Sequence, residues 1–273
     1  MPDTNHPLKI CVIGATGRMG GTVLKDAPAN RFEVTGAVAA AGETAIGKSL
    51  RDLGTSNVDT LVSTPEALPD LLRRSDVCIS FTSPAAEVAN LPAILESKRP
   101  LVMGTTGFTE DQRKWIMNAI PGVIPTVMSS NFSVGANALF AIAATLKNLP
   151  KDFDISIVEA HHSGKADAPS GTATTIAEIV SEARGYSKTV HGRSGMSKRT
   201  REELEVTSLR GGGVPGIHEI YAFGPSEMLK FEHLAFSRSV FAQGALLAAQ
   251  WVVEGREPKL YSMFDVLGFR AQP

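Results

Sequence analysis

Strand-like and helix-like segments alternate along the first half of this chain, and this alternation restricts its possible folds more than any other feature. Short apolar runs at residues 9–13, 32–39 and 76–81 are typical of buried strands. Helical patterns separate them, and the one that begins at Thr109 has Gln112 in place for a capping box. Such alternation predicts an α/β domain with a parallel, doubly wound sheet, as in Rossmann-like folds.

Weaker patterns complete this first half. We expect a helix over residues 65–74, with Thr64 as its N-cap and Pro65 in its first position. Further helices are predicted at residues 19–25 and 83–97, and further strands at residues 101–103 and 123–128.

The pattern changes after Asn131. A long apolar helix is predicted over residues 133–149, then a strand at 154–159 and a helix at 172–184 that Gly185 ends. Three strand-like segments follow without intervening helices, at residues 205–209, 218–222 and 228–235, before a last helix at 240–253. Consecutive strands predict an open, mixed or mostly antiparallel sheet in a C-terminal α+β domain.

We therefore expect two domains. Residues 1–131, together with about 241–273, would bind a dinucleotide, and residues 132–240 would bind the substrate and form an oligomer. Residues 186–201 are polar and basic and predict one long exposed loop. Such a loop suits either a solvated connection or a mobile lid.

The overall composition argues against several classes of partner. The chain has 273 residues and a formal net charge of −1, so we expect neither a nucleic acid nor a membrane partner. Cys11 and Cys78 each lie in an apolar run, which favours buried free thiols and a reducing compartment. With no signal-peptide core and no apolar run of about 20 residues, we expect a cytoplasmic protein.

A glycine-rich turn lies between the first predicted strand and the first helix. It consists of Gly14, Ala15, Thr16, Gly17, Arg18 and Met19, with Gly20 directly after it. Glycine allows the main chain to approach a pyrophosphate at a helix N-terminus. The spacing G-x-x-G-x-x-G is a variant of the usual dinucleotide fingerprint, so its place at the first strand–helix junction carries the argument. We expect this turn to bind a dinucleotide.

The end of the second predicted strand bears on which dinucleotide binds. An acidic residue at this point usually contacts the ribose hydroxyls of NADH. Here the chain runs through Ala39 and Ala40, and no carboxylate occurs until Glu43. Nothing there would repel a 2′-phosphate, and Arg18 could pair with one. The sequence favours NADPH and leaves NADH open.

Two more turns follow predicted strands. They contain Gly104, Thr105 and Thr106, and Ser129, Ser130, Asn131 and Phe132. Doubly wound sheets bind ligands beyond the carboxyl ends of their strands. We therefore expect both turns to lie near the nicotinamide.

The densest group of reactive side chains lies in residues 159–173, which read EAHHSGKADAPSGTA. His161 and His162 would point to opposite sides of an extended chain, and no other His or Cys cluster completes a ligand set, so no metal site is expected. An imidazole suits proton transfer near neutrality, and Lys165 could supply a proton or stabilise negative charge. Asp167 could pair with Lys165. Ser170, Gly171 and Thr172 provide a hydroxyl cap and N–H groups at a helix start, an arrangement suited to a carboxylate.

This segment, E-A-H-H-x-x-K-x-D-A-P-S-G-T-A, resembles the signature of the 4-hydroxy-tetrahydrodipicolinate reductase (dihydrodipicolinate reductase) family. The similarity extends over nearly the whole chain, through residues 12–20, 104–108 (GTTGF), 131–135 (NFSVG) and 237–245. The long histidine-containing motif is specific to that family, whereas the glycine turn is not.

The resemblance implies a role for each matching residue. His161 would be a proton donor or acceptor and Lys165 a proton donor, while His162, Gly171 and Thr172 would contact the substrate. The turns at residues 14–19, 104–106 and 129–132 would line the cofactor. The family also implies a homotetramer assembled through the C-terminal sheets. Its members often carry an acidic pair that is absent here at Ala39 and Ala40.

Together these features predict an NAD(P)H-dependent reductase of a small dicarboxylate in the diaminopimelate route to lysine. Hydride would reach C4 of a cyclic imine, and His161 or Lys165 would protonate the neighbouring carbon. Either the hydroxylated ring or its dehydrated form fits as the immediate substrate. Two alternatives stay open: another nicotinamide-dependent imino- or amino-acid reductase, and a dinucleotide-sensing protein without catalysis.

Overall fold

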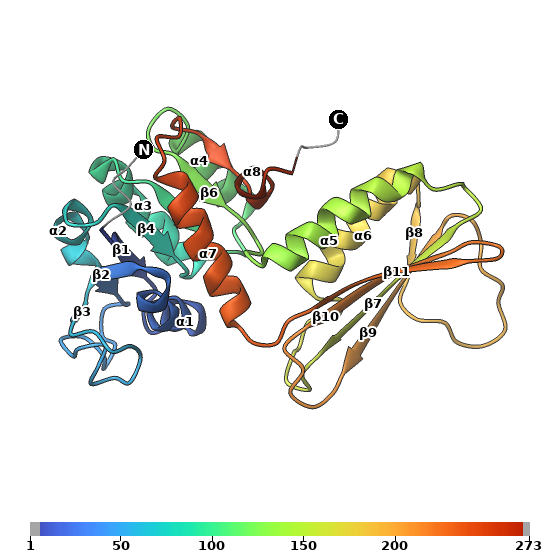
Figure 1. Cartoon of the computed structure of the whole chain (residues 1–273), viewed down its shortest axis with the longest axis horizontal. Coiled ribbons are helices and arrows are strands. Elements are labelled where there is room, and N and C mark those ends of the chain that lie inside the picture. Colours follow the sequence, from blue (N-terminus) through green and yellow to red (C-terminus); the bar gives the residue numbers. More distant parts are fainter. Residues whose placement is uncertain (1–5, 270–273) are drawn as a thin grey trace. The chain divides into compact units, whose positions relative to one another are not determined.

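The computed structural model describes residues 6–269, which form two compact units. Unit 1 consists of residues 6–133 and 239–269, and unit 2 consists of residues 134–238 (Figure 1).

Unit 1 is built on a parallel sheet. Among the described residues it has seven strands, in the order β12-β6-β5-β4-β1-β2-β3, and every neighbouring pair is parallel. The strands are β1 (Leu8–Ile13), β2 (Phe32–Val38), β3 (Val62–Ser63), β4 (Val77–Ser80), β5 (Leu101–Met103), β6 (Thr126–Met128) and β12 (Leu260–Tyr261). The predicted doubly wound α/β fold is confirmed.

Helices cover both faces of this sheet because successive residues of β1 alternate between two apolar cores. Ile10 and Val12 lie in the core that includes α1 (Arg18–Asp26) and α7 (Ser239–Val252). Cys11 and Ile13 lie in the opposite core. That second core includes side chains of α2 (Leu68–Arg73), α3 (Pro84–Ser97) and α4 (Glu110–Ala119). Short helices η1 (Pro28–Asn30), η2 (Pro65–Ala67) and α8 (Met263–Leu267) complete the unit.

The structure corrects two predicted elements of unit 1. Residues 65–74 form η2 and then α2 instead of one helix. Thr64 is the N-cap residue of η2 and Pro65 takes the first position, as predicted, but the Thr64 side chain makes no cap hydrogen bond. Pro69 has no N–H to donate to Pro65, so the first turn closes as a 3-10 turn through the Leu68 N–H. The strand predicted at 123–128 is shorter, because Val123 and Ile124 instead bond back to Ile120.

Unit 2 has a mixed sheet of five strands among its described residues, in the order β11-β10-β7-β9-β8. They are β7 (Asp154–His161), β8 (Lys188–Val190), β9 (Glu203–Arg210), β10 (Ile217–Phe223) and β11 (Met228–Leu234). Strand β10 is antiparallel to β7 and β11, whereas β9 is parallel to β7 and β8. This confirms the predicted mixed sheet.

One face of this sheet carries the helices α5 (Val134–Thr145) and α6 (Gly171–Arg184) (Figure 1). The predicted helix 133–149 is shorter and ends in the 3-10 turn η3 (Leu146–Asn148). On β7, Ile155, Ile157, Glu159 and His161 are buried in alternation. The opposite face exposes apolar side chains, including Leu209, Phe223 and Leu234.

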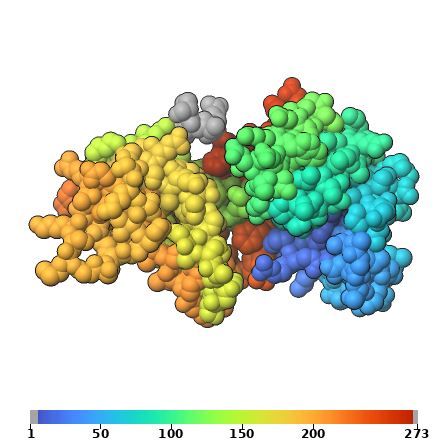
Figure 2. All heavy atoms as spheres, turned by 180° about the vertical axis from the view of Figure 1, so that it is seen from behind, coloured from blue at the N-terminus to red at the C-terminus, as the bar shows by residue number. Residues whose placement is uncertain are grey.

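The segment 186–201 is not a single loop, because it contains β8. Glu203 holds it: its carboxylate forms ion pairs with Lys188 and Arg193. Most of residues 191–200 is exposed on the surface of unit 2, as Figure 2 shows in yellow-orange.

Within residues 6–269 no helix has the length and apolar character needed to cross a membrane.

Candidate functional site

The three turns predicted to bind the cofactor all follow parallel strands of unit 1. Gly14 follows β1, Gly104 follows β5 and Ser129 follows β6. Because parallel strands end at the same edge of a sheet, the turns lie along one edge, where doubly wound folds bind ligands.

The glycine turn is shaped for close approach of the main chain. Gly14 has φ 87°, and a Cβ atom there would lie 2.1 Å from the carbonyl oxygen of Phe81. A Cβ atom on Gly20 would lie 2.0 Å from the Gly14 oxygen, so α1 packs directly against the turn. Gly17 is the N-cap of α1 without a side-chain cap, and the first turn holds no acidic residue. These features fit a phosphate at the helix N-terminus.

Phe81, which our sequence reasoning missed, joins the three turns. Its carbonyl oxygen lies against Gly14, and a Cβ atom on Gly104 would lie 2.0 Å from its ring. The ring also packs edge-on against Phe132, with centroids 5.7 Å apart. Phe132 is only 2% exposed, so its ring belongs to the core of unit 1.

The other two turns are held by internal hydrogen bonds. The Thr105 hydroxyl is buried and accepts the Thr82 N–H at 3.0 Å, whereas Thr106 is exposed. The Ser129 hydroxyl donates to the Asn131 carbonyl at 2.7 Å, and the Asn131 side-chain oxygen accepts the Ser133 N–H at 2.8 Å. Ser130 is exposed.

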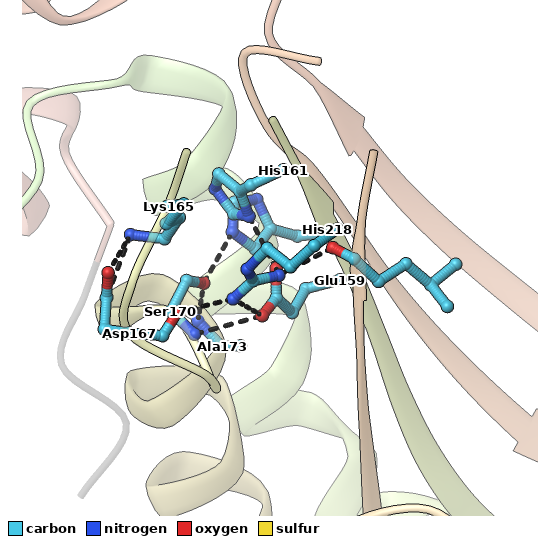
Figure 3. Close-up of polar contacts among 9 residues, drawn as sticks. Glu159, His161, Lys165, Asp167, Ser170, Ala173 and His218 are labelled. Atoms are coloured by element: carbon cyan, nitrogen blue, oxygen red, sulfur yellow. Dashed lines mark hydrogen bonds and ion pairs between the residues drawn. The ribbon is translucent and has the colours of Figure 1, made fainter. Parts of the chain in front are cut away.

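In unit 2, a fully buried carboxylate organises the histidine-containing segment (Figure 3). Both oxygens of Glu159 accept hydrogen bonds from the Arg210 guanidinium, at 2.8 and 2.9 Å. Glu159 also bonds His161 Nδ1 at 2.5 Å and the Ser170 N–H at 3.2 Å. Burial alone would raise the pKa of Glu159, but hydrogen bonds, chiefly from Arg210, lower it to about 2. The carboxylate is therefore ionised at neutral pH.

This ionised partner determines the state of His161. A carboxylate can only accept, so Nδ1 of His161 carries the proton and Nε2 is left for exchange. Burial lowers the pKa of His161 below its usual value, although Glu159 acts in the opposite direction. At neutral pH the imidazole is thus mostly neutral. His161 is 8% exposed, and its neighbour His162 is half-buried.

The other predicted site residues of unit 2 are Lys165 and those at the start of α6. The Lys165 ammonium contacts both carboxylate oxygens of Asp167 at 2.8 Å, as the sequence suggests. Ser170 is the N-cap of α6, and its hydroxyl accepts the Ala173 N–H at 3.2 Å. Gly171 is exposed and has open space where a Cβ would stand.

His218 is a further buried imidazole that our sequence reasoning missed. It faces Glu159 across the β7–β10 ladder, bonds the Ser170 hydroxyl at 3.2 Å and packs against His161 with ring centroids 5.1 Å apart. Burial, followed by repulsion from His161 and His233, lowers the pKa of His218 to about 3. No local pattern marks this residue, because only strand register brings it to the segment.

The low pKa of His218 predicts loss of stability in acid. An unfolded imidazole takes up a proton near pH 6.5, whereas the folded one stays neutral until about pH 3, so acid favours unfolding. Between pH 7 and pH 4 this residue should lower the free energy of unfolding by about 3 kcal/mol. Urea titrations of the wild type and His218→Gln across this range measure the difference. Equal pH dependence in both proteins would contradict the assignment.

Within residues 6–269 no three His, Cys, Asp or Glu side chains are grouped so that they could hold a metal ion.

Comparisons with known proteins cover nearly the whole chain. The family model described as dihydrodipicolinate reductase, N-terminus, matches residues 8–132, and the model described as dihydrodipicolinate reductase, C-terminus, matches residues 135–267. The 4-hydroxy-tetrahydrodipicolinate reductase of Methanoregula boonei is 38% identical over 261 residues, 95% of this chain and 98% of that protein. That of Methanoculleus marisnigri is 39% identical over 267 residues, 96% of this chain and 99% of that protein.

A solved structure shares the fold. Dipicolinate-bound dihydrodipicolinate reductase from Paenisporosarcina sp. TG-14 superposes with a TM-score of 0.71 at 21% identity, covering 95% of this chain and 98% of that one.

Proposed function

Because this chain belongs to the dihydrodipicolinate reductase family, we propose that it reduces 4-hydroxy-tetrahydrodipicolinate, via dihydrodipicolinate, to tetrahydrodipicolinate in the diaminopimelate route to lysine. It is an NAD(P)H-dependent oxidoreductase. The observation that carries the proposal is that both family models match, over residues 8–132 and 135–267.

Unit 1 is proposed to hold the cofactor, which supplies hydride when bound. The turns at residues 14–19, 104–106 and 129–132 would hold it, and the uncapped N-terminus of α1 supports a phosphate position there. We propose a preference for NADPH over NADH. Arg18 is exposed and forms no ion pair with any described residue, and Ala39 and Ala40 follow β2 where an acid would repel the 2′-phosphate.

Unit 2 is proposed to hold the substrate, a small dicarboxylate. Lys165 offers a positive charge, and the start of α6 offers main-chain N–H groups at Gly171 and Thr172. His162 would contribute a further contact. Ser170 would act mainly by holding the helix start, because its hydroxyl already bonds Ala173 and His218.

Two groups in unit 2 can move the proton that the reduction requires. His161 exchanges a proton at Nε2, while Glu159 holds Nδ1 and stabilises the charged imidazole that proton uptake creates. Lys165 already carries a transferable proton on its ammonium group, which Asp167 keeps in place. We propose both residues as the acid–base pair of the reaction.

The test is an absorbance assay of cofactor oxidation with enzymatically generated 4-hydroxy-tetrahydrodipicolinate, run with NADPH and NADH separately. We expect substrate-dependent oxidation with a higher kcat/KM for NADPH. An equal or higher kcat/KM for NADH would contradict the proposed preference for NADPH but not the proposed reaction. Oxidation only with another imino acid would indicate a different reductase, and tight cofactor binding without turnover would indicate a sensing protein.

We also propose a homotetramer formed through the sheet of unit 2. The face of this sheet opposite α5 and α6 exposes 53% of Leu209, 42% of Phe223 and 43% of Leu234. Exposed apolar area of this kind on a sheet is typical of a protein–protein interface. Light scattering coupled to gel filtration should give four times the chain mass of 29.0 kDa. A monomeric mass would contradict this assembly.

A further inference from the structure

A second buried carboxyl group lies in unit 1, and the mechanism above does not use it. Glu87 is in the first turn of α3 and is 0% exposed. It forms no ion pair with any residue from 6 to 269. A carboxyl group buried without a cation is costly, so its retention requires a physical reason.

All side-chain hydrogen bonds of Glu87 within the described residues converge on one oxygen. Oε2 accepts the hydroxyls of Ser80 at 2.7 Å, Thr82 at 3.0 Å and Thr105 at 2.5 Å. The other oxygen, Oε1, is buried and has no partner among the described residues. Burial raises the pKa of Glu87, although the three hydroxyls act in the opposite direction.

These contacts join two neighbouring strand ends. Ser80 is the last residue of β4, Thr82 lies two residues beyond it, and Thr105 lies two residues beyond the end of β5. The Thr105 hydroxyl accepts the Thr82 N–H at 3.0 Å, so its own proton is directed to Glu87. Without the carboxyl group the Thr105 hydroxyl would lose the acceptor of its proton, and the Thr82 hydroxyl would keep only contacts at 3.3 Å to the Ser83 carbonyl and to Thr105. The turn at residues 104–106 would then be anchored through Thr105 by the Thr82 N–H and this longer hydroxyl contact.

We propose that Glu87 is a positioning residue for the nicotinamide cofactor, since it holds Thr82 and Thr105 so that the turn at residues 104–106 keeps its binding conformation. This inference rests on the proposed function, which assigns that turn to the cofactor. Glu87 itself is buried and acts only through the two threonines.

The experiment compares Glu87→Ala with Glu87→Gln. The amide oxygen of glutamine can still accept the three hydroxyls, whereas alanine removes the acceptor of the Ser80 and Thr105 hydroxyls and leaves Thr82 only its contacts at 3.3 Å. We expect Glu87→Ala to raise the Kd of the reduced nicotinamide cofactor by about tenfold, as measured by fluorescence in the absence of substrate. This factor corresponds to the affinity lost with one buried hydrogen bond. The KM of the dicarboxylate substrate should change less than about twofold, and Glu87→Gln should restore most of the cofactor affinity.

Two milder variants keep the test decisive if Glu87→Ala does not fold. Thr82→Val removes a hydroxyl that anchors the turn and should raise the cofactor Kd several-fold. Ser75→Ala serves as the matched control: it removes a buried hydroxyl, which donates to the Leu71 carbonyl at 2.8 Å, just before the start of β4 and away from Glu87. It should leave the cofactor affinity unchanged. Wild-type affinity in both Glu87→Ala and Thr82→Val, or equal loss in Thr82→Val and Ser75→Ala, would overturn the proposal. A wild-type protein that binds no reduced nicotinamide would instead overturn the proposed function.

Discussion

Replacement of Lys165 by alanine is expected to lower turnover by about 100-fold or more, and replacement of His161 by alanine to have an effect of the same order. A positioned acid or base accelerates proton transfer by about 10²- to 10⁴-fold, and each substitution removes one member of the proposed pair. Steady-state kinetics with saturating cofactor and varied substrate give kcat and KM separately. Lys165→Ala should also raise KM, because its ammonium group is proposed to bind a substrate carboxylate.

The control for both variants is His191→Ala. His191 is an exposed imidazole in the same unit and has no part in the proposed site, so its removal should leave kcat and KM unchanged. Circular dichroism and thermal unfolding establish that the variants fold. Near-normal turnover in both His161→Ala and Lys165→Ala would exclude these residues as the acid–base pair.

Elements with a strong local signal were predictable to within a residue or two. Ser83 caps α3 by accepting the Ala86 N–H, and the capping box of Thr109 and Gln112 is present. Gly185 ends α6 in the left-handed conformation with φ 79°. The Lys165–Asp167 ion pair joins residues two positions apart, so the sequence already indicates it. In each case the interacting groups lie within one turn of chain, where spacing determines geometry.

Partners far apart in the sequence were not predictable. Arg210 reaches Glu159 across 51 positions, and His218 reaches Ser170 across 48, because the register of β7 with β9 and β10 places them together. Glu87 looks like an ordinary acidic residue in the first turn of a helix, and only the fold turns it inward to Thr105. Strand register depends on the packing of the whole sheet, so no single segment encodes these contacts.

Replacement of Glu159 by glutamine is expected to destabilise the protein by about 3 kcal/mol and to lower turnover by about tenfold or more. Glu159 is 0% exposed and the Arg210 side chain 19%, so the substitution leaves a mostly buried guanidinium without its counter-charge. It also removes the charge that stabilises protonated His161. The matched control is Glu254→Gln, since Glu254 forms an exposed ion pair with Arg256. The free energy of unfolding should fall by less than about 1 kcal/mol in this variant. Urea titration and steady-state kinetics measure the two effects.

A double variant separates the stability of this ion pair from its part in catalysis. Apolar residues in place of both members of a buried pair often restore stability, because no unpaired charge is left. Glu159→Leu combined with Arg210→Met should therefore be more stable than Glu159→Gln, yet it should remain about tenfold or more less active, because His161 still lacks its carboxylate. Recovery of turnover together with stability would show that Glu159 supports activity only by stabilising the fold. Recovery of stability alone would assign it a positioning role toward the proton-transferring imidazole.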